Sequence, residues 1–301
     1  MRRQNAQEAV KLALKIDVDT LRGTAEGVPR LVELLKRHRA GATFLFSLGP
    51  DHTGRALRRI FRPGFFSKVS RTSVLEHYGL RTLLYGTLLP GPDIGRRCAD
   101  VMRRVRDAGF EVGVHCWDHV RWQDFVTRRD ADWTEREMER ARRRFAEVFR
   151  TEAKTWGAAG WQLNRYAAWY EERHFDYASD TRGTGPFRPL WDGVAIGCPQ
   201  LPTTLPTLDE LIGLHDDVVQ HLLSRTAHGD HVFTAHAELE GGKLMPMFEA
   251  LLAGWKAQGY ELVALETLYG ALDVAYLPRC EVLQGTVPGR SGTLALQGEA
   301  A

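Results

Sequence analysis

Short apolar runs alternate with amphipathic segments along this chain, and this alternation constrains its fold more than any other feature. The runs have the length of buried strands, while the segments between them repeat apolar residues with helical spacing. Regular alternation with short connections is typical of an α/β protein with a parallel sheet or barrel. We predict strands at 12–18, 42–48, 110–115, 151–158, 175–179, 194–201, 231–237 and 261–265, and helices at 27–39, 94–108, 133–149, 162–173, 216–227 and 244–258.

Polar side chains that suit catalysis follow several of these predicted strands. Seven candidates stand at such positions: Asp17, Asp19, His115, His119, Asp180, His236 and Glu238. Because chemistry in parallel α/β folds collects at the carboxyl ends of the strands, we expect these side chains to gather at one edge of the sheet.

The two histidines of the sequence HCWDH predict a metal site. Residues four apart share a face once the chain enters a helical turn, so His115 and His119 can aim at one point. Asp19 can supply a third ligand and leave a position open for chemistry. This donor set suits zinc, and also manganese, cobalt, nickel or iron. Between the histidines, Cys116 is either a soft ligand or a small buried filler, and Asp118 is expected to cap the helix.

The remaining candidates support hydrolysis of an amide. A bound metal lowers the pKa of a water molecule and polarises a carbonyl group. Asp17 then serves as the general base, and His236 gives a proton to the leaving nitrogen. A carboxylate raises the pKa of a neighbouring histidine, so we expect Asp180 to orient His236. The alternative for His236 is a core histidine bonded to the backbone.

Composition excludes several classes of protein. The formal charge of +2 is too small for binding to nucleic acid through overall charge. The four cysteines show no C-x-x-C spacing, so we expect reduced thiols rather than a disulfide framework. We find no signal peptide and no apolar run long enough to span a membrane. We therefore expect a protein that is soluble or bound peripherally to a membrane.

We divide the chain into a catalytic domain at residues 1–275 and a tail at 276–301. Gly, Thr, Ser and Gln dominate the end of the chain, so we expect the tail to be disordered.

The segment at residues 55–92 is too long for an ordinary connection between a strand and a helix. It mixes apolar and aromatic residues with basic ones, and Glu76 is its only acid. Such a mixture suits an anionic membrane surface or a lipid phosphate. The alternative is an extra helical hairpin that packs on the core, with its basic residues in solvent.

The acids and histidines together resemble the motifs of the NodB-homology polysaccharide deacetylase superfamily, metal-dependent amide hydrolases with a distorted (β/α) barrel. Asp17 and Asp19 match its first motif, in which a base precedes a ligand. His115 and His119 match its second motif, and His236 matches the acid of its last motif. The resemblance implies that Asp17 is the base, that Asp19 and the two motif histidines are ligands, and that His236 is the acid.

One motif departs from the superfamily pattern. The third motif usually carries an arginine that pairs with the base, whereas the corresponding sequence here is AAGW at 158–161. Arg182 or Arg188 could substitute from another loop.

Longer strings, spread over the chain to about residue 272, resemble one branch of the superfamily. They are IDVDT at 16–20, RGT at 22–24, EGVPR at 26–30, FSLGPD at 46–51, HCWDH at 115–119, AAGW at 158–161, SDTRG at 179–183, PFRP at 186–189, LPTTLPT at 201–207 and HAELEG at 236–241. The resemblance implies a deformylase that acts on undecaprenyl-phosphate-linked 4-deoxy-4-formamido-L-arabinose. This activity belongs to the cytoplasmic face of the bacterial inner membrane and to the modification of lipid A that protects against polymyxin and other cationic peptides.

Other functions stay open at this point. A second enzymatic reading is a deacetylase of another N-acylated sugar or glycan. A reading from another class is a catalytically inactive module that binds lipid or carbohydrate, although binding alone needs neither Asp17 nor His236. A nucleic-acid partner is not expected, since the chain has no recognised motif for one.

Overall fold

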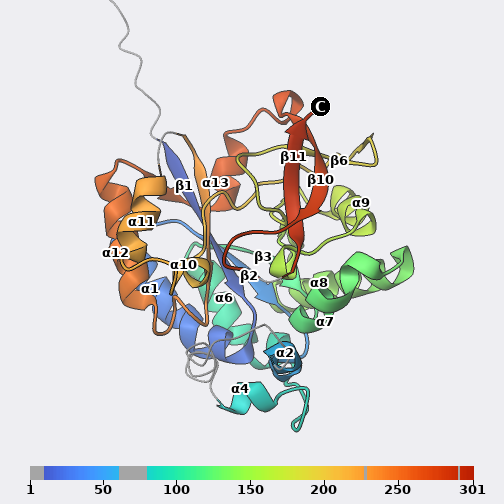
Figure 1. The fold of residues 1–301 in the computed structure, drawn as a ribbon. Helices are drawn as coiled ribbons and strands as arrows, with labels where there is room; N and C mark the ends of the chain where they lie inside the picture. The colour runs from blue at the N-terminus through green and yellow to red at the C-terminus, as the bar shows by residue number, and fades with distance from the viewer. Residues whose placement is uncertain (1–9, 61–79, 227–228, 291) are drawn as a thin grey trace, which may run out of the picture.

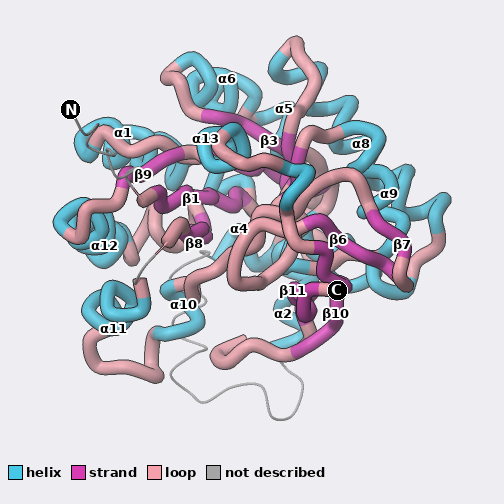
Figure 2. Tube along the Cα trace, turned by 90° about the horizontal axis from the view of Figure 1, so that it is seen from above, coloured by secondary structure: helices cyan, strands magenta, loops and turns pink. Residues whose placement is uncertain are grey.

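A curled parallel sheet forms the centre of the computed structural model, which describes residues 10–60, 80–226, 229–290 and 292–301. The strand order is β5-β4-β3-β2-β1-β8, and β9 pairs with the beginning of β1. Helices surround the sheet, as Figures 1 and 2 show from two directions. The predicted α/β architecture with a distorted barrel is confirmed.

The predicted elements of the barrel are present, several of them shorter than expected. The strands of the central sheet are β1 (Lys11–Val18), β2 (Thr43–Ser47), β3 (Glu111–Cys116), β4 (Thr155–Trp156), β5 (Tyr177–Ala178), β8 (His231–His236) and β9 (Glu261–Val263). The helices are α1 (Val28–His38), α2 (Thr53–Ile60), α4 (Leu80–Leu84), α5 (Ile94–Arg97), α6 (Ala99–Asp107), α7 (His119–Phe125), α8 (Ala131–Phe149), α9 (Arg165–His174), α10 (Leu208–Leu211), α11 (Val218–Arg225), α12 (Met245–Ala257) and α13 (Leu265–Gly270). Single turns of other helix types are η1 (Gly23–Gly27), η2 (Val126–Arg128), η3 (Ala159–Trp161) and η4 (Val274–Tyr276).

Strand β1 runs through the middle of the sheet and carries part of the candidate site. All of its residues from Leu12 to Val18 are buried, as expected for a parallel strand covered on both faces. It pairs with β2 on one side and β8 on the other, which places Asp17 beside His236. Because all these pairs are parallel, the carboxyl ends of β1, β3 and β8 lie at the same edge of the sheet.

Helices pack against the sheet on both sides of β1. At the left of Figure 1, α12 lies between α11 and α1 and contacts both helices, and it also contacts β9. On the right, α8 contacts both β3 and α9. Helix α1 shows how the sequence directs this packing, since Leu31, Leu34 and Leu35 are buried on one face. Its last turn is basic, which complements the negative end of the helix dipole.

A second sheet lies beside the barrel and corrects one prediction. Its strands, in the order β11-β10-β6-β7, are β6 (Arg188–Trp191), β7 (Val194–Ala195), β10 (Arg279–Gly285) and β11 (Leu294–Ala300). The prediction of a disordered tail at 276–301 is therefore wrong. Most of β10 is exposed or half-buried, and the strand is held between its neighbour β11 and β6, which lies far earlier in the chain. The strand predicted at 194–201 is limited to the two residues of β7.

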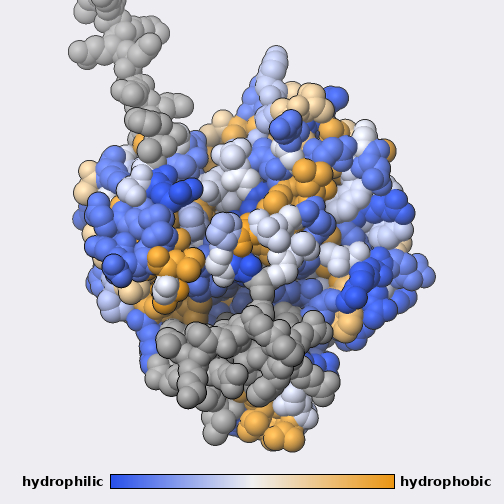
Figure 3. Space-filling view, in the orientation of Figure 1, coloured by the Kyte–Doolittle hydropathy of each residue, from blue (hydrophilic) through white to orange (hydrophobic). Residues whose placement is uncertain are grey.

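The segment predicted as an insertion is described only at its two ends. Residues 61–79, which carry most of its aromatic residues, lie outside the described residues. At the flanks, α2 and α4 lie together, and Nε of Arg55 donates to the Gly86 carbonyl at 2.9 Å. Leu88 is 81% exposed and Leu89 38%. Hydrophobic surface is visible at the lower edge of Figure 3, where α4 lies in Figure 1.

No helix in the described ranges combines the length and the apolar composition that crossing a bilayer requires.

Candidate metal and active site

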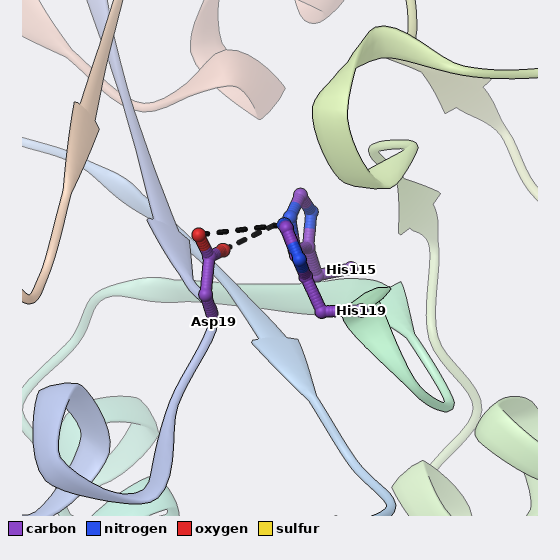
Figure 4. A group of neighbouring side chains, drawn as sticks. All are labelled: Asp19, His115 and His119. Carbon is purple, nitrogen blue, oxygen red and sulfur yellow. Dashed lines mark ion pairs between the residues drawn. The ribbon is translucent and has the colours of Figure 1, made fainter. Parts of the chain in front are cut away.

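Three side chains converge at the carboxyl edge of the sheet. Asp19 follows β1, His115 lies in β3, and His119 begins α7. Oδ1 of Asp19 is 3.2 Å from Nε2 of His115, and Oδ2 of Asp19 is 3.4 Å from Nε2 of His119 (Figure 4). One ligand atom from each residue lies within 4.8 Å of the others. The structure therefore brings together the three residues that we predicted as metal ligands.

The donor atoms of this triad fit a divalent metal. Nδ1 of His115 lies 2.6 Å from the Gly157 carbonyl, so Nδ1 donates its proton there and Nε2 turns a lone pair toward Asp19. Oδ1 of Asp19 is buried and accepts no hydrogen bond from the described residues. Ligand atoms around a tetrahedral zinc bonded at about 2.1 Å stand about 3.4 Å apart, close to the two distances between Asp19 and the histidines.

The electrostatics of Asp19 agree with this interpretation. Burial alone would raise the pKa of Asp19, but the neighbouring His119 and His115 outweigh burial and hold that pKa well below its usual range. The carboxylate is thus ionised and ready to act as a ligand.

Asp17, the predicted base, lies beside the triad and is paired with a buried lysine. Oδ1 of Asp17 is 3.9 Å from Nδ1 of His115, and Oδ2 is 3.6 Å from Nζ of Lys15. Lys15 is fully buried, and Nζ donates a hydrogen bond to the Ser179 carbonyl at 2.7 Å. The ammonium group therefore fixes the position of the Asp17 carboxylate.

The cation beside Asp17 is not one that we expected. Arg182, one of the two arginines expected to substitute for that of the third motif, donates instead to Oε1 of Glu210 at 2.5 Å. The sequence contains a signal that could have identified Lys15. It is a lysine inside an otherwise apolar strand, and it lies two residues before Asp17, so the two side chains share a face of the strand.

His236, the predicted acid, ends β8 and faces a carboxylate from α10. Nδ1 of His236 is 3.9 Å from Oδ1 of Asp209. Burial lowers the pKa of His236, but the charges of Asp209 and Asp19 outweigh burial, so the pKa lies above its ordinary value. A histidine in this setting holds its proton more firmly, as an acid catalyst requires.

The prediction that Asp180 orients His236 is wrong. Oδ1 of Asp180 accepts from the backbone N–H of Ala158 at 2.6 Å, and Oδ2 accepts from Nε2 of Gln200 at 2.7 Å. Asp180 therefore holds the AAGW loop, while Asp209 takes the position beside the histidine. The capping box that begins α10 was the sequence signal that could have located Asp209.

Arg290, in the turn between β10 and β11, reaches the site from the tail. It stacks over the ring of Trp161 at 4.3 Å, and its Nε donates to Oε1 of Glu210 at 2.8 Å. It also lies 3.5 Å from Oδ2 of Asp209, so it holds the carboxylate that faces His236. Trp161 has φ 53, a conformation that bulky residues rarely adopt, and its ring centroid is 6.2 Å from that of His236.

The two other residues named between the histidines have structural roles. Cys116 is fully buried, and its Sγ is 3.3 Å from Oγ of Ser47. Burial raises the pKa of the Cys116 thiol well above its ordinary value, which fits the interpretation as a filler rather than a ligand. Asp118 caps α7 by accepting from the backbone N–H of Arg121, as predicted.

The Asp209→Asn variant should move the alkaline limb of the pH–activity profile to lower pH. An acid catalyst must be protonated, so activity is lost as the pH rises through the pKa of His236. Asp209 raises that pKa, and its neutral replacement lowers it. We would record kcat/KM against pH, with the exposed Asp216→Asn as the matched control. An alkaline limb that stays in place would contradict the assigned pairing of Asp209 with His236.

Comparisons with known proteins place this site in a family. A sequence model of the family described as "Polysaccharide deacetylase" matches residues 7–175. The chain therefore belongs to the polysaccharide deacetylase family. A Shewanella sediminis (strain HAW-EB3) protein named "Probable 4-deoxy-4-formamido-L-arabinose-phosphoundecaprenol deformylase ArnD" is 36% identical, over 97% of this chain and 96% of its own. A protein of the same name from Wigglesworthia glossinidia brevipalpis is 30% identical, over 91% of this chain and 98% of its own.

A solved structure supports the fold. The crystal structure of a putative polysaccharide deacetylase from Mycobacterium smegmatis superposes with a TM-score of 0.63 at 15% identity, covering 94% of this chain and 98% of that chain. The family-model match ends at residue 175, whereas Asp209, His236 and Arg290 lie beyond it.

Proposed function

We propose that the protein is a metal-dependent deformylase that removes the formyl group from undecaprenyl-phosphate-linked 4-deoxy-4-formamido-L-arabinose. The observation that carries the proposal is the convergence of Asp19, His115 and His119. On one side of this triad lies Asp17 with Lys15, and His236 with Asp209 also lies beside it. Both relatives carry the name of this deformylase and match this chain over nearly its whole length. Zinc is the metal we propose, and manganese, cobalt, nickel and iron also suit the donor set.

The residues around the triad supply the proton transfers. A metal held by the triad would lower the pKa of water and polarise the formyl carbonyl group. Asp17 takes a proton from the attacking water as its oxygen bonds to the formyl carbon. His236 gives its proton to the sugar nitrogen as the C–N bond breaks, which leaves formate and a free amine. Lys15 and Asp209 fix the base and the acid in place.

Formate release tests the proposed function. The zinc-loaded protein is given the lipid-linked formamido sugar, its N-acetyl counterpart or a soluble chitooligosaccharide. We expect formate from the first substrate and at least a hundredfold slower release of acetate from the others, since a specific amide site discriminates by several kcal/mol. Acetate release without formate release would favour a deacetylase of another glycan. No release from any substrate by the folded, metal-loaded protein would favour an inactive binding module.

We also propose that the protein acts at the cytoplasmic face of the inner membrane and contacts it through the segment at 55–92. Support comes from the exposed Leu88 and Leu89 in the turn after α4 and from the basic residues of the segment. A substrate whose lipid stays in the bilayer requires the enzyme to come to the membrane surface.

Co-sedimentation with anionic liposomes tests this membrane contact. The double variant Leu88→Asp/Leu89→Asp should lose most of the bound fraction, because two exposed apolar side chains become charges of the same sign as the lipid. Leu214→Asp, at another exposed leucine that is 60% accessible, is the matched control and should bind like wild type. Equal binding by the wild type and the double variant would argue against this contact.

A further inference from the structure

A cavity of about 250 Å³ lies at the carboxyl ends of β1 and β8, outside the metal triad. Two segments form its walls: the turn and helix start that follow β1, and the loop that follows β8. None of the residues that we assigned to the reaction lines it. The proposed reaction therefore does not explain why these residues line a cavity.

Glycines bring the two walls of the cavity together. A Cβ atom on Gly27 would stand 2.0 Å from the Ala237 carbonyl oxygen, and one on Gly241 would stand 2.4 Å from the same atom. A Cβ atom on Gly23 would stand 2.0 Å from Oε1 of Glu238. Side chains at these three positions would force the two segments apart. The close approach of the segments therefore requires glycine at each position.

Glu238 forms a wall that the cavity shares with the metal site. Its Oε1 accepts from the backbone N–H groups of Asp19 and Thr20 at 3.0 and 2.7 Å. Its Oε2 is buried and has no hydrogen-bond partner within the described ranges. Glu238 thus joins the loop after β8 to the residues that follow β1, and its second oxygen has a hydrogen-bonding capacity that no described residue satisfies.

The lining of the cavity carries more positive than negative side chains. Arg22, Arg30 and Lys243 contribute three cations against two acidic residues, Glu26 and Glu238, and Glu26 is paired with Arg22 at 3.1 Å. Cations on a concave surface favour an anion with several oxygen acceptors, and phosphate is the common biological group of this kind.

The proposed substrate has a phosphate at the required place. Its formamide and its phosphate stand at opposite ends of one pyranose ring, so a formyl group at the triad directs the phosphate to a neighbouring subsite. We propose that this cavity binds the sugar phosphodiester of the substrate, with Arg30 and Lys243 facing the phosphate and Glu238 facing a hydroxyl of the sugar. This inference rests on the proposed deformylase function and adds to it the residues that recognise the phosphate.

A comparison of two soluble substrates tests the inference. One is 4-deoxy-4-formamido-L-arabinose with a methyl phosphodiester at C1, and the other is the methyl glycoside of the same sugar, which lacks phosphate. The wild type should prefer the phosphodiester in kcat/KM by at least tenfold. Arg30→Gln and Lys243→Gln should each reduce this preference by about tenfold, the effect of one charge-assisted hydrogen bond. Lys36→Gln, on the same helix α1 but outside the cavity, is the control and should retain the full preference.

The outcomes separate this inference from the proposed function. Equal kcat/KM for the two substrates, or a preference that both cavity variants retain, overturns the phosphate subsite while deformylation stands. Inorganic phosphate that inhibits with an inhibition constant below the KM of the phosphodiester would assign the cavity to free phosphate and also overturn it. A wild type that releases formate from neither soluble substrate nor the lipid-linked one overturns the proposed function, and the inference with it.

Discussion

The Asp17→Asn variant should bind metal like the wild type and lose turnover by about 10²- to 10⁴-fold, the range for removal of a general base. The asparagine has nearly the same shape as aspartate but cannot take the proton of water. Oδ1 of Asp17 lies 3.9 Å from Nδ1 of His115, the nitrogen bonded to the Gly157 carbonyl rather than the one that faces Asp19. The ligand atoms are therefore unchanged. Atomic emission measures the metal content of the variant, and formate release measures its turnover.

The Asp17→Asn experiment needs a control for folding, since Lys15 loses its anionic partner in a buried place. Thermal unfolding of the variant shows whether the loss of turnover has a structural origin. Asp132→Asn, an exposed substitution in the first turn of α8, is the matched control. A variant that lost metal and kept turnover would reverse the roles of Asp17 and Asp19.

The His119→Ala variant should lose both metal and turnover. Only Asp19 and His115 remain as ligands, and catalytic zinc sites ordinarily use three protein ligands. The side chain of His119 is 20% exposed at the start of α7, so its removal leaves the core intact. We expect formate release to fall below detection, and added metal to restore it poorly.

A remote histidine provides the comparison for His119. His221→Ala, on α11, should retain metal and rate because that side chain lies outside the site. Full metal occupancy in His119→Ala would mean that this histidine is not a ligand.

The sequence predicted the triad because two simple rules place it. Apolar runs mark the buried parallel strands, and the carboxyl ends of such strands meet at one edge, so Asp19 and His115 had to approach each other. The four-residue spacing then placed His119 beside them. Both rules depend on local patterns and on one general property of parallel sheets.

The residues that were missed depend on contacts between distant parts of the chain. Asp180 and Asp209 both stand at the catalytic edge, and only the path of the loops decides which one faces His236. The tail forms a hairpin of β10 and β11, and β10 also pairs with β6, a distant partner that the composition of the tail does not reveal. The position of Arg290 over the ring of Trp161 depends on this pairing, so the sequence alone could not assign Arg290 to the site.

Anomalous scattering from crystals grown with zinc tests the central claim most directly. The account predicts a single strong peak at the zinc edge within bonding distance of Asp19, His115 and His119, with Asp17 and His236 beside the peak and unbound. An absence of any peak among these three side chains, or a peak at some other group of ligands, would contradict the account.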